Sequence, residues 1–191
     1  MKILINTPKI NIPAGVANHY LGLKPYFSHN VIYNQYFTRF NLRKIFKLKI
    51  LYIPVFPIVF IMNHLKFIFL ILKLNRPTVL LNPSFGKTAM KRDAQFLKIA
   101  KSLGCKVAVF IHGWDKNYLD KVLKKEEYFS NKWYNADAFF VLATEFKEYL
   151  KKLNIKAPIH LTTTKVNDQL IDGVPEKSIT VIKSILFLSR I

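Results

Sequence analysis

One complete helix-to-strand unit lies in Leu97-Lys-Ile-Ala-Lys-Ser-Leu-Gly-Cys-Lys-Val-Ala-Val-Phe-Ile111. Apolar residues recur at helical spacing up to Leu103, and Gly104 follows at the point where a helix would end. Lys106–Ile111 is then an apolar run without in-and-out alternation. Such a run is typical of a strand that is covered on both faces, as in a parallel sheet.

Runs of this kind recur along the chain, and stretches with helical spacing separate them. Besides Lys106–Ile111, the sequence predicts strands at Lys2–Asn6, Asn30–Asn34, Thr78–Asn82, Ala138–Leu142, Ile159–Thr162 and Ile185–Leu188. Alternating strands and helices are typical of an open α/β sheet. We therefore expect an α/β fold with a Rossmann-like, open, mainly parallel sheet and helices on both faces.

The change in composition after residue 164 predicts a domain boundary. Residues 1–164 are expected to form the Rossmann-like domain, and residues 165–183 are polar and irregular, which is typical of a linker. Residues 184–191 start a fresh apolar run, which we interpret as the first strand of a truncated second domain. The alternative is that this run is the last strand of a single sheet.

The charge of the chain indicates an anionic partner. Thirty lysine and arginine residues against eleven acidic ones give a formal charge of +19. The partner classes are nucleic acid, a phosphorylated small molecule or an anionic membrane. No nucleic-acid-binding motif is visible, so we expect no nucleic acid. The histidine and cysteine spacing predicts no metal site and no cofactor, and the single Cys105 fits a cytoplasmic location.

The segment Arg39–Lys73 differs from the rest of the chain. It begins with basic residues and continues as an apolar run that contains Pro54 and Pro57, with Lys66 further along. These residues argue against a transmembrane helix. Two interpretations remain open and are compatible: a loop and helix that pack on the sheet, or a basic, apolar surface that lies on an anionic leaflet. The second predicts a peripheral protein on the inner membrane face.

Two turns that follow predicted strands are candidates for phosphate binding. Ala14 and Gly15 lie at the expected start of a helix, where backbone N–H groups suit a phosphate. The dinucleotide signature is absent, so this turn does not predict NAD binding. The second turn, Phe85-Gly-Lys-Thr88, matches half of a phosphate loop, but Leu81 stands where that motif needs glycine and Pro83 lacks an N–H group.

His112 directly follows the predicted strand Lys106–Ile111, and Gly113 comes next. In an open α/β sheet, ligands bind at the carboxyl ends of the strands. A histidine at this position can donate a hydrogen bond to a sugar hydroxyl or a phosphate. The alternative is a purely structural histidine.

Several segments together resemble a known family. The opening Met1–Pro8 with Ala14-Gly-Val-Ala-Asn-His-Tyr20 resembles the first strand and glycine-rich loop of family-4 glycosyltransferases. Other segments resemble a bacterial subgroup of that family linked to surface polysaccharide synthesis, including its later strands and the strand that opens the second domain: Arg76–Ser84, Lys91–Asp93, Val109–Asp115, Asn135–Leu142 and Ile185–Arg190.

The resemblance implies a retaining transfer from a nucleotide-sugar to a polysaccharide or lipid-linked acceptor, as in lipopolysaccharide synthesis, by an enzyme of the two-domain GT-B type. It implies that the loop at Gly15 touches the donor diphosphate and that His112 is a catalytic residue near the donor sugar. Asn82, Arg92 and Asp115 are expected in the acceptor cleft, and each has a structural alternative. The nucleotide would bind a second domain, encoded separately, without which the chain is expected to be inactive.

Two other functions remain open at this point. The first is a non-catalytic protein that binds a membrane surface through its basic residues. The second is a nucleotide-binding protein that uses the half-motif around Lys87.

Overall fold

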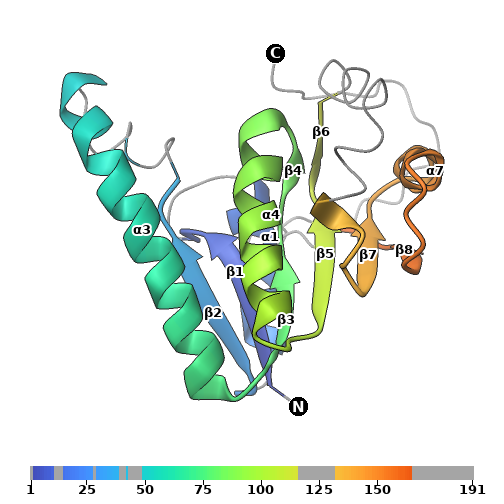
Figure 1. Ribbon diagram of the computed structural model, residues 1–191. Helices are drawn as coiled ribbons and strands as arrows, with labels where there is room; N and C mark the ends of the chain where they lie inside the picture. Colours follow the sequence, from blue (N-terminus) through green and yellow to red (C-terminus); the bar gives the residue numbers. More distant parts are fainter. Residues whose placement is uncertain are drawn as a thin grey trace, which may run out of the picture.

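A six-stranded parallel sheet is the centre of the computed structural model, which describes residues 2–10, 15–27, 29–38, 42, 49–115 and 132–164 (Figure 1). The strand order is β2-β1-β3-β5-β7-β8, and every neighbouring pair is parallel. The strands are β1 (Ile3–Pro8), β2 (Val31–Tyr36), β3 (Thr78–Leu81), β5 (Val107–Ile111), β7 (Ala138–Val141) and β8 (Ile159–Leu161).

A second, two-stranded sheet continues the chain beyond two of these strands. β4 (Ser84–Phe85) follows β3, and β6 (Gly113–Trp114) follows β5. The two short strands are parallel, with Ser84 opposite Gly113. They extend the carboxyl edge of the main sheet between β3 and β5.

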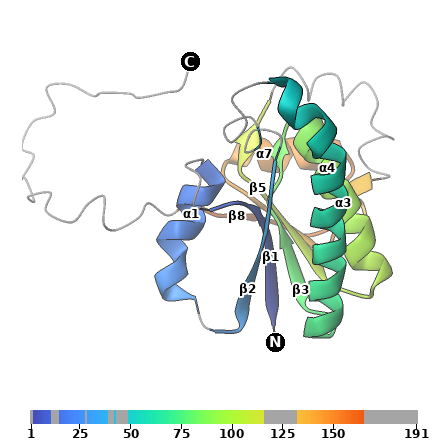
Figure 2. The same cartoon turned by 90° about the vertical axis from the view of Figure 1, so that its left-hand side faces the viewer.

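Helices cover both faces of the main sheet (Figure 2). α1 (Gly15–Leu23), followed by the 3₁₀ turn η1 (Lys24–Tyr26), lies on one face. α3 (Lys49–Leu74) and α4 (Lys87–Ser102) lie on the other, and α7 (Thr144–Lys152) contributes to the same core as these two. The fold is therefore the open, Rossmann-like α/β class that the sequence predicts.

The core has two parts because the sheet separates them. The larger part lies under α3, α4 and α7 and contains the buried rings of Phe67, Phe96 and Phe139. The smaller part lies under α1 and is built around Ile5 and Tyr20. Burial of this apolar surface is the main term that stabilises both layers.

Six of the seven expected strands are confirmed, each within two residues at either end. Gly104 ends α4 as expected, with a φ of 76° that favours glycine. The seventh strand, Ile185–Leu188, and the domain boundary at residues 165–183 lie outside the described residues, as does Ala14.

The long helix α3 makes up most of the segment Arg39–Lys73. Pro54 and Pro57 both lie inside this continuous helix of 26 residues. Each proline removes one N–H donor from the helix ladder. Both prolines are exposed.

The strand order changes direction at one place. β1 lies between β2 and β3, and the helices that lead away from β1 and from β3 cover opposite faces. In open α/β sheets, ligands bind outside the carboxyl ends of the strands at such a switch point. The point of interest is therefore the edge where β1 and β3 end.

Candidate functional site

Three asparagines mark the carboxyl ends of neighbouring strands. Asn6 in β1 is in register with Asn34 in β2, and Asn82 directly follows β3. All three side chains are buried. The amide nitrogen of Asn34 donates to Oδ1 of Asn6 at 2.8 Å. A row of buried amides thus crosses the switch point.

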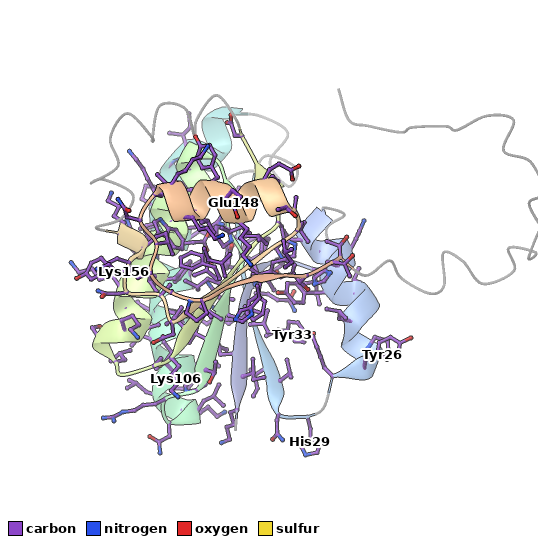
Figure 3. The ribbon with its side chains drawn as sticks, turned by 90° about the vertical axis from the view of Figure 1, so that its right-hand side faces the viewer. Tyr26, His29, Tyr33, Lys106, Glu148 and Lys156 are labelled. Atoms are coloured by element: carbon purple, nitrogen blue, oxygen red, sulfur yellow. The ribbon has the colours of Figure 1, made fainter. Side chains whose placement is uncertain are left out.

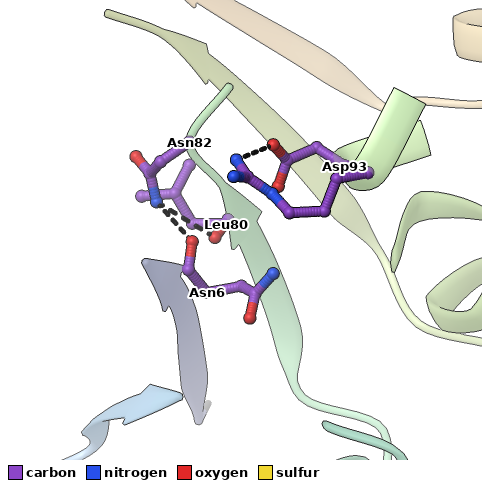
Figure 4. A network of polar contacts seen from close by, with 5 residues as sticks. Asn6, Leu80, Asn82 and Asp93 are labelled. Carbon is purple, nitrogen blue, oxygen red and sulfur yellow. Dashed lines mark hydrogen bonds and ion pairs between the residues drawn. The ribbon is translucent and has the colours of Figure 1, made fainter. Parts of the chain in front are cut away.

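The amide of Asn82 has all of its hydrogen-bonding positions occupied. Its Oδ1 lies 2.5 Å from the hydroxyl of Tyr20 and 3.0 Å from Nε2 of His112. Its Nδ2 donates to the carbonyl oxygens of Asn6 at 3.0 Å and Leu80 at 3.4 Å (Figure 4). Carbonyl oxygens only accept, so the amide group that faces them must be the Nδ2 donor, which fixes the orientation of the amide. The Tyr20 hydroxyl and Nε2 of His112 must then both donate to Oδ1.

This arrangement fixes the tautomer of His112. Its Nε2 carries the proton, and Nδ1 is left as an acceptor in the neutral ring. The ring lies 3.8 Å from that of Phe110 and 5.1 Å from that of His19, measured between centroids. Burial, with a smaller contribution from His19, lowers the pKa of His112 from 6.5 to about 3.

The hydrogen bond to Asn82 determines what His112 can offer a ligand. The sequence suggests a donor to a hydroxyl or a phosphate, and in the structure the Nε2 proton is already bonded to Asn82. The ring therefore offers an acceptor at neutral pH, and an acceptor suits a hydroxyl better than a phosphate. Burial also lowers the pKa of His19, so both histidines are neutral at this edge.

The helix that follows β1 brings His19 against this ring. Gly15 starts the helix and is exposed, and a Cβ built on it would meet no atom of the described residues within 4 Å. His19, one turn further along the same helix, contacts His112. Glycine is therefore not required here by crowding, and the first turn leaves room for a ligand. Its backbone N–H groups favour an anion.

Arg92 lies on the opposite face of the sheet. It is part of α4 and forms an ion pair with the buried Asp93, which Figure 4 shows across β3 from Asn82. Its guanidinium is 4.6 Å from the centroid of the Tyr36 ring. Burial raises the pKa of Asp93, and Arg92 opposes that shift. The structure does not bring Arg92 together with His112.

The remaining sequence candidates have different positions. Asp115 follows β6 directly and is exposed. The half-motif around Lys87 begins in β4, whose backbone pairs with β6, and Gly86 is extended with φ −134°. A loop that wraps a phosphate would need those backbone groups, so this geometry gives the nucleotide-binding alternative no support. Within the described ranges, no group of three or more His, Cys, Asp or Glu side chains could hold a metal ion.

His29 provides a useful contrast with His19 and His112. Figure 3 shows it, like Lys106, at the edge where the strands begin. It precedes β2, so it lies at the amino edge of the sheet and away from the switch point. His29 therefore differs from His19 and His112 because it lies at the opposite edge of the sheet.

Tyr20, His19 and Asn6 are the site residues that the sequence analysis did not identify. The ring of Tyr20 is packed in the smaller core. Its hydroxyl nevertheless reaches Asn82, 62 residues away. A signal was present in the sequence: three predicted strands, Lys2–Asn6, Asn30–Asn34 and Thr78–Asn82, each end in asparagine.

The fold and this edge define the chain as an open α/β domain with a buried amide and imidazole cluster at its switch point. Comparisons with protein-family models, with curated proteins and with solved structures gave no match.

Proposed function

We propose that the described domain is the acceptor-side half of a retaining glycosyltransferase of the GT-B type. It would transfer a sugar from a nucleotide-sugar to a polysaccharide or lipid-linked acceptor of the cell surface. One observation supports this most: a neutral imidazole, held by Asn82, lies at the switch point in contact with His19, one turn beyond the start of α1.

The two parts of this edge suit the two parts of a sugar diphosphate. Sugar hydroxyls are donors, and the unprotonated Nδ1 of His112 can accept from one of them. The first turn of α1 at Gly15 has backbone N–H groups and the positive end of the helix dipole, which favour a diphosphate. Because His112 is neutral, it does not compete with that turn for the negative charge.

The other residues then have distinct roles. Asn82 is a positioning residue, because its amide is fully bonded and has no group left for a ligand. Asp115, exposed beyond β6, remains the candidate for acceptor contact. The nucleotide would be held by a second domain, as the resemblance implies, in a cytoplasmic protein on the inner membrane face. No cofactor or metal enters the proposal.

A second candidate function is a non-catalytic protein that binds a membrane surface. The exposed apolar side chains of α3 favour it. This candidate needs no ligand at His112, so ligand binding at the switch point separates the two functions.

A titration followed by nuclear magnetic resonance tests the proposal on the chain as it exists. Glucose 1-phosphate and inorganic diphosphate serve as probes, because they carry the groups expected at this edge. We expect both to shift the amide signals of Gly15 and His19. The sugar phosphate alone should also shift the ring signals of His112.

His112→Ala and His29→Ala are the matched variants, one at each edge of the sheet. The first should weaken the binding of glucose 1-phosphate, followed by the amide signals of Gly15 and His19, and leave the binding of diphosphate unchanged, and the second should change neither. Shifts that map to α3 and α4, or an unchanged affinity for glucose 1-phosphate in His112→Ala, would contradict the proposal.

A further inference from the structure

The outer side of α3 carries a continuous apolar surface. Its large side chains there are between 54% and 63% exposed. We call them the outer face of α3: Ile53, Ile58, Ile61, Met62, Leu65, Phe69 and Leu72. Monomeric soluble proteins rarely expose an apolar patch of more than a few hundred Å² unless it binds something. The outer face therefore needs an occupant.

A membrane span is the first candidate, because Ile53–Leu74 is 22 residues long with a mean hydropathy of 2.1. Only 11% of its most apolar window is buried, so it is not an ordinary core helix. Its inner side, however, is part of the domain. Phe67 and Ile71 are buried in the larger core, and His64 stacks on Phe96 of α4 at 4.5 Å between centroids.

Polar contacts and topology also hold α3 beside the sheet. The side-chain amide of Asn63 donates to the carbonyl of Phe37 at 3.0 Å and accepts from its N–H at 3.3 Å. The strands before and after the helix, β2 and β3, both pair with β1. Since one sheet cannot be divided across a bilayer, α3 cannot cross the membrane while this fold is intact.

A second copy of the chain is the next candidate. Ile58, Met62, Leu65, Phe69 and Leu72 follow a spacing of four, three, four and three residues, which suits a two-stranded coiled coil. The helix contains no acidic residue, and Lys66 and Lys73 flank the apolar row. Two copies would bring these lysines together, in chains that each carry a formal charge of +19. Charge therefore disfavours self-association through this face.

An anionic lipid leaflet matches both properties of the surface. Lipid acyl chains accept the apolar side chains, and anionic headgroups attract the lysines at the rim. The sequence immediately before the helix adds Arg43, Lys44 and Lys47. Lys66 is exposed, and its ammonium donates to the carbonyl of Gln35 at 3.3 Å, at the boundary between the helix and the sheet.

We propose that α3 lies in the plane of an anionic membrane leaflet and inserts its outer face at the boundary between headgroups and acyl chains. The helix keeps its inner side on β2 and α4, so the domain docks without unfolding. This proposal rests on α3 and is independent of any ligand at His112.

Vesicle co-sedimentation of the full chain tests the proposal. One set of vesicles contains phosphatidylcholine alone, and the other contains phosphatidylcholine with phosphatidylglycerol. We expect binding to the anionic vesicles, weakened by salt. The double variant Leu65→Glu and Phe69→Glu should lower that binding by about tenfold or more, because it places two charges in the inserted face.

Leu161→Glu is the matched control, since Leu161 is 52% exposed on β8 at the other edge of the sheet. It adds one negative charge at an apolar surface position, against two in the double variant, and should leave vesicle binding unchanged. Leu65 and Phe69 are exposed, so their replacement should not change the urea midpoint of unfolding. That midpoint verifies that the double variant is folded.

Three results would overturn the proposal. The double variant binds anionic vesicles as well as the parent chain does. The parent chain is a dimer in sedimentation velocity, and the double variant is a monomer, which assigns the outer face to a second copy. Membranes that carry the chain retain it after alkaline carbonate extraction, which indicates a span.

Discussion

The two faces of the sheet hold two buried polar clusters of different character. On the α1 face, Asn82 joins Tyr20 and His112 through hydrogen bonds between neutral groups. On the α4 face, Asp93 and Arg92 form a buried ion pair beside Tyr36. We refer to these as the Asn82 cluster and the Asp93 cluster. Both occupy the region near the carboxyl ends of β1, β2 and β3.

The clusters differ in how completely their polar atoms are bonded. The Asn82 amide uses every donor and acceptor it has. In the Asp93 cluster, Nε of Arg92, Oδ1 of Asp93 and the hydroxyl of Tyr36 have no hydrogen-bond partner among the described residues. A satisfied neutral network holds a ring in place at little cost, whereas a buried ion pair loses much of its attraction to desolvation. The Asn82 cluster therefore suits an edge that binds a ligand, and the Asp93 cluster attaches α4 to β2.

The largest expected effect comes from breaking the ion pair. Asp93→Ala leaves the largely buried Arg92 guanidinium, whose side chain is 18% exposed, without its fully buried carboxylate partner. We expect it to lower the free energy of unfolding by about 3–5 kcal/mol, measured by urea denaturation.

The double variant Arg92→Met and Asp93→Leu is the control for that result. It removes both charges and keeps the volume, so it should cost less than Asp93→Ala alone. If Asp93→Ala is as stable as the parent chain, the pair is not buried as the structure has it, and the contrast between the two clusters disappears.

Much of the fold follows from local patterns in the sequence. Buried parallel strands are continuous apolar runs, as in Lys106–Ile111, and these runs locate six strands of the main sheet. Gly104 ends α4 because its positive φ is unfavourable for other residues. Such signals are confined to a few neighbouring residues, so a single sequence is enough to detect them.

The parts that were missed depend on contacts between distant segments. Nothing near Pro54 and Pro57 indicates that α3 continues through them, since the helix is held by Asn63 and Phe67 against β2 and α4. The Asn82 cluster joins residues from three separate elements. Its members were visible as polar residues at strand ends, but their pairing depends on the strand order, which local patterns do not encode.

The protonation of His112 is expected to have the next largest effect. Its pKa is about 3 in the folded chain and about 6.5 when the chain is unfolded. Above pH 6.5 His112 is neutral in the folded and in the unfolded chain, so its titration does not reduce the free energy of unfolding. As the pH falls below 6.5, the unfolded chain takes up a proton that the folded chain does not. The free energy of unfolding should therefore fall, by up to about 1.4 kcal/mol per pH unit.

His112→Gln tests this dependence, because its amide can still donate to Asn82 and does not titrate. Urea denaturation at pH 7 and at pH 5 should give a smaller loss of stability for His112→Gln than for the parent chain. His160→Gln, an exposed histidine on β8, controls for the loss of any imidazole. Parallel pH profiles for the parent chain and His112→Gln would mean that the His112 ring is not held neutral.

The smallest expected effect is the difference in stability between Tyr20→Phe in the Asn82 cluster and Tyr36→Phe in the Asp93 cluster. The Tyr20 hydroxyl donates to Asn82, whereas the equally buried Tyr36 hydroxyl interacts with the Arg92 guanidinium without a hydrogen bond of ordinary length and angle. Tyr20→Phe should cost about 1 kcal/mol of unfolding free energy, because a buried acceptor loses one donor. Tyr36→Phe removes only this weaker interaction and keeps the ring under Arg92, so it should cost less than Tyr20→Phe. Paired urea denaturation curves resolve this difference. Equal costs at both positions would mean that the Tyr36 hydroxyl is bonded as well as that of Tyr20, and that the two clusters differ only in charge.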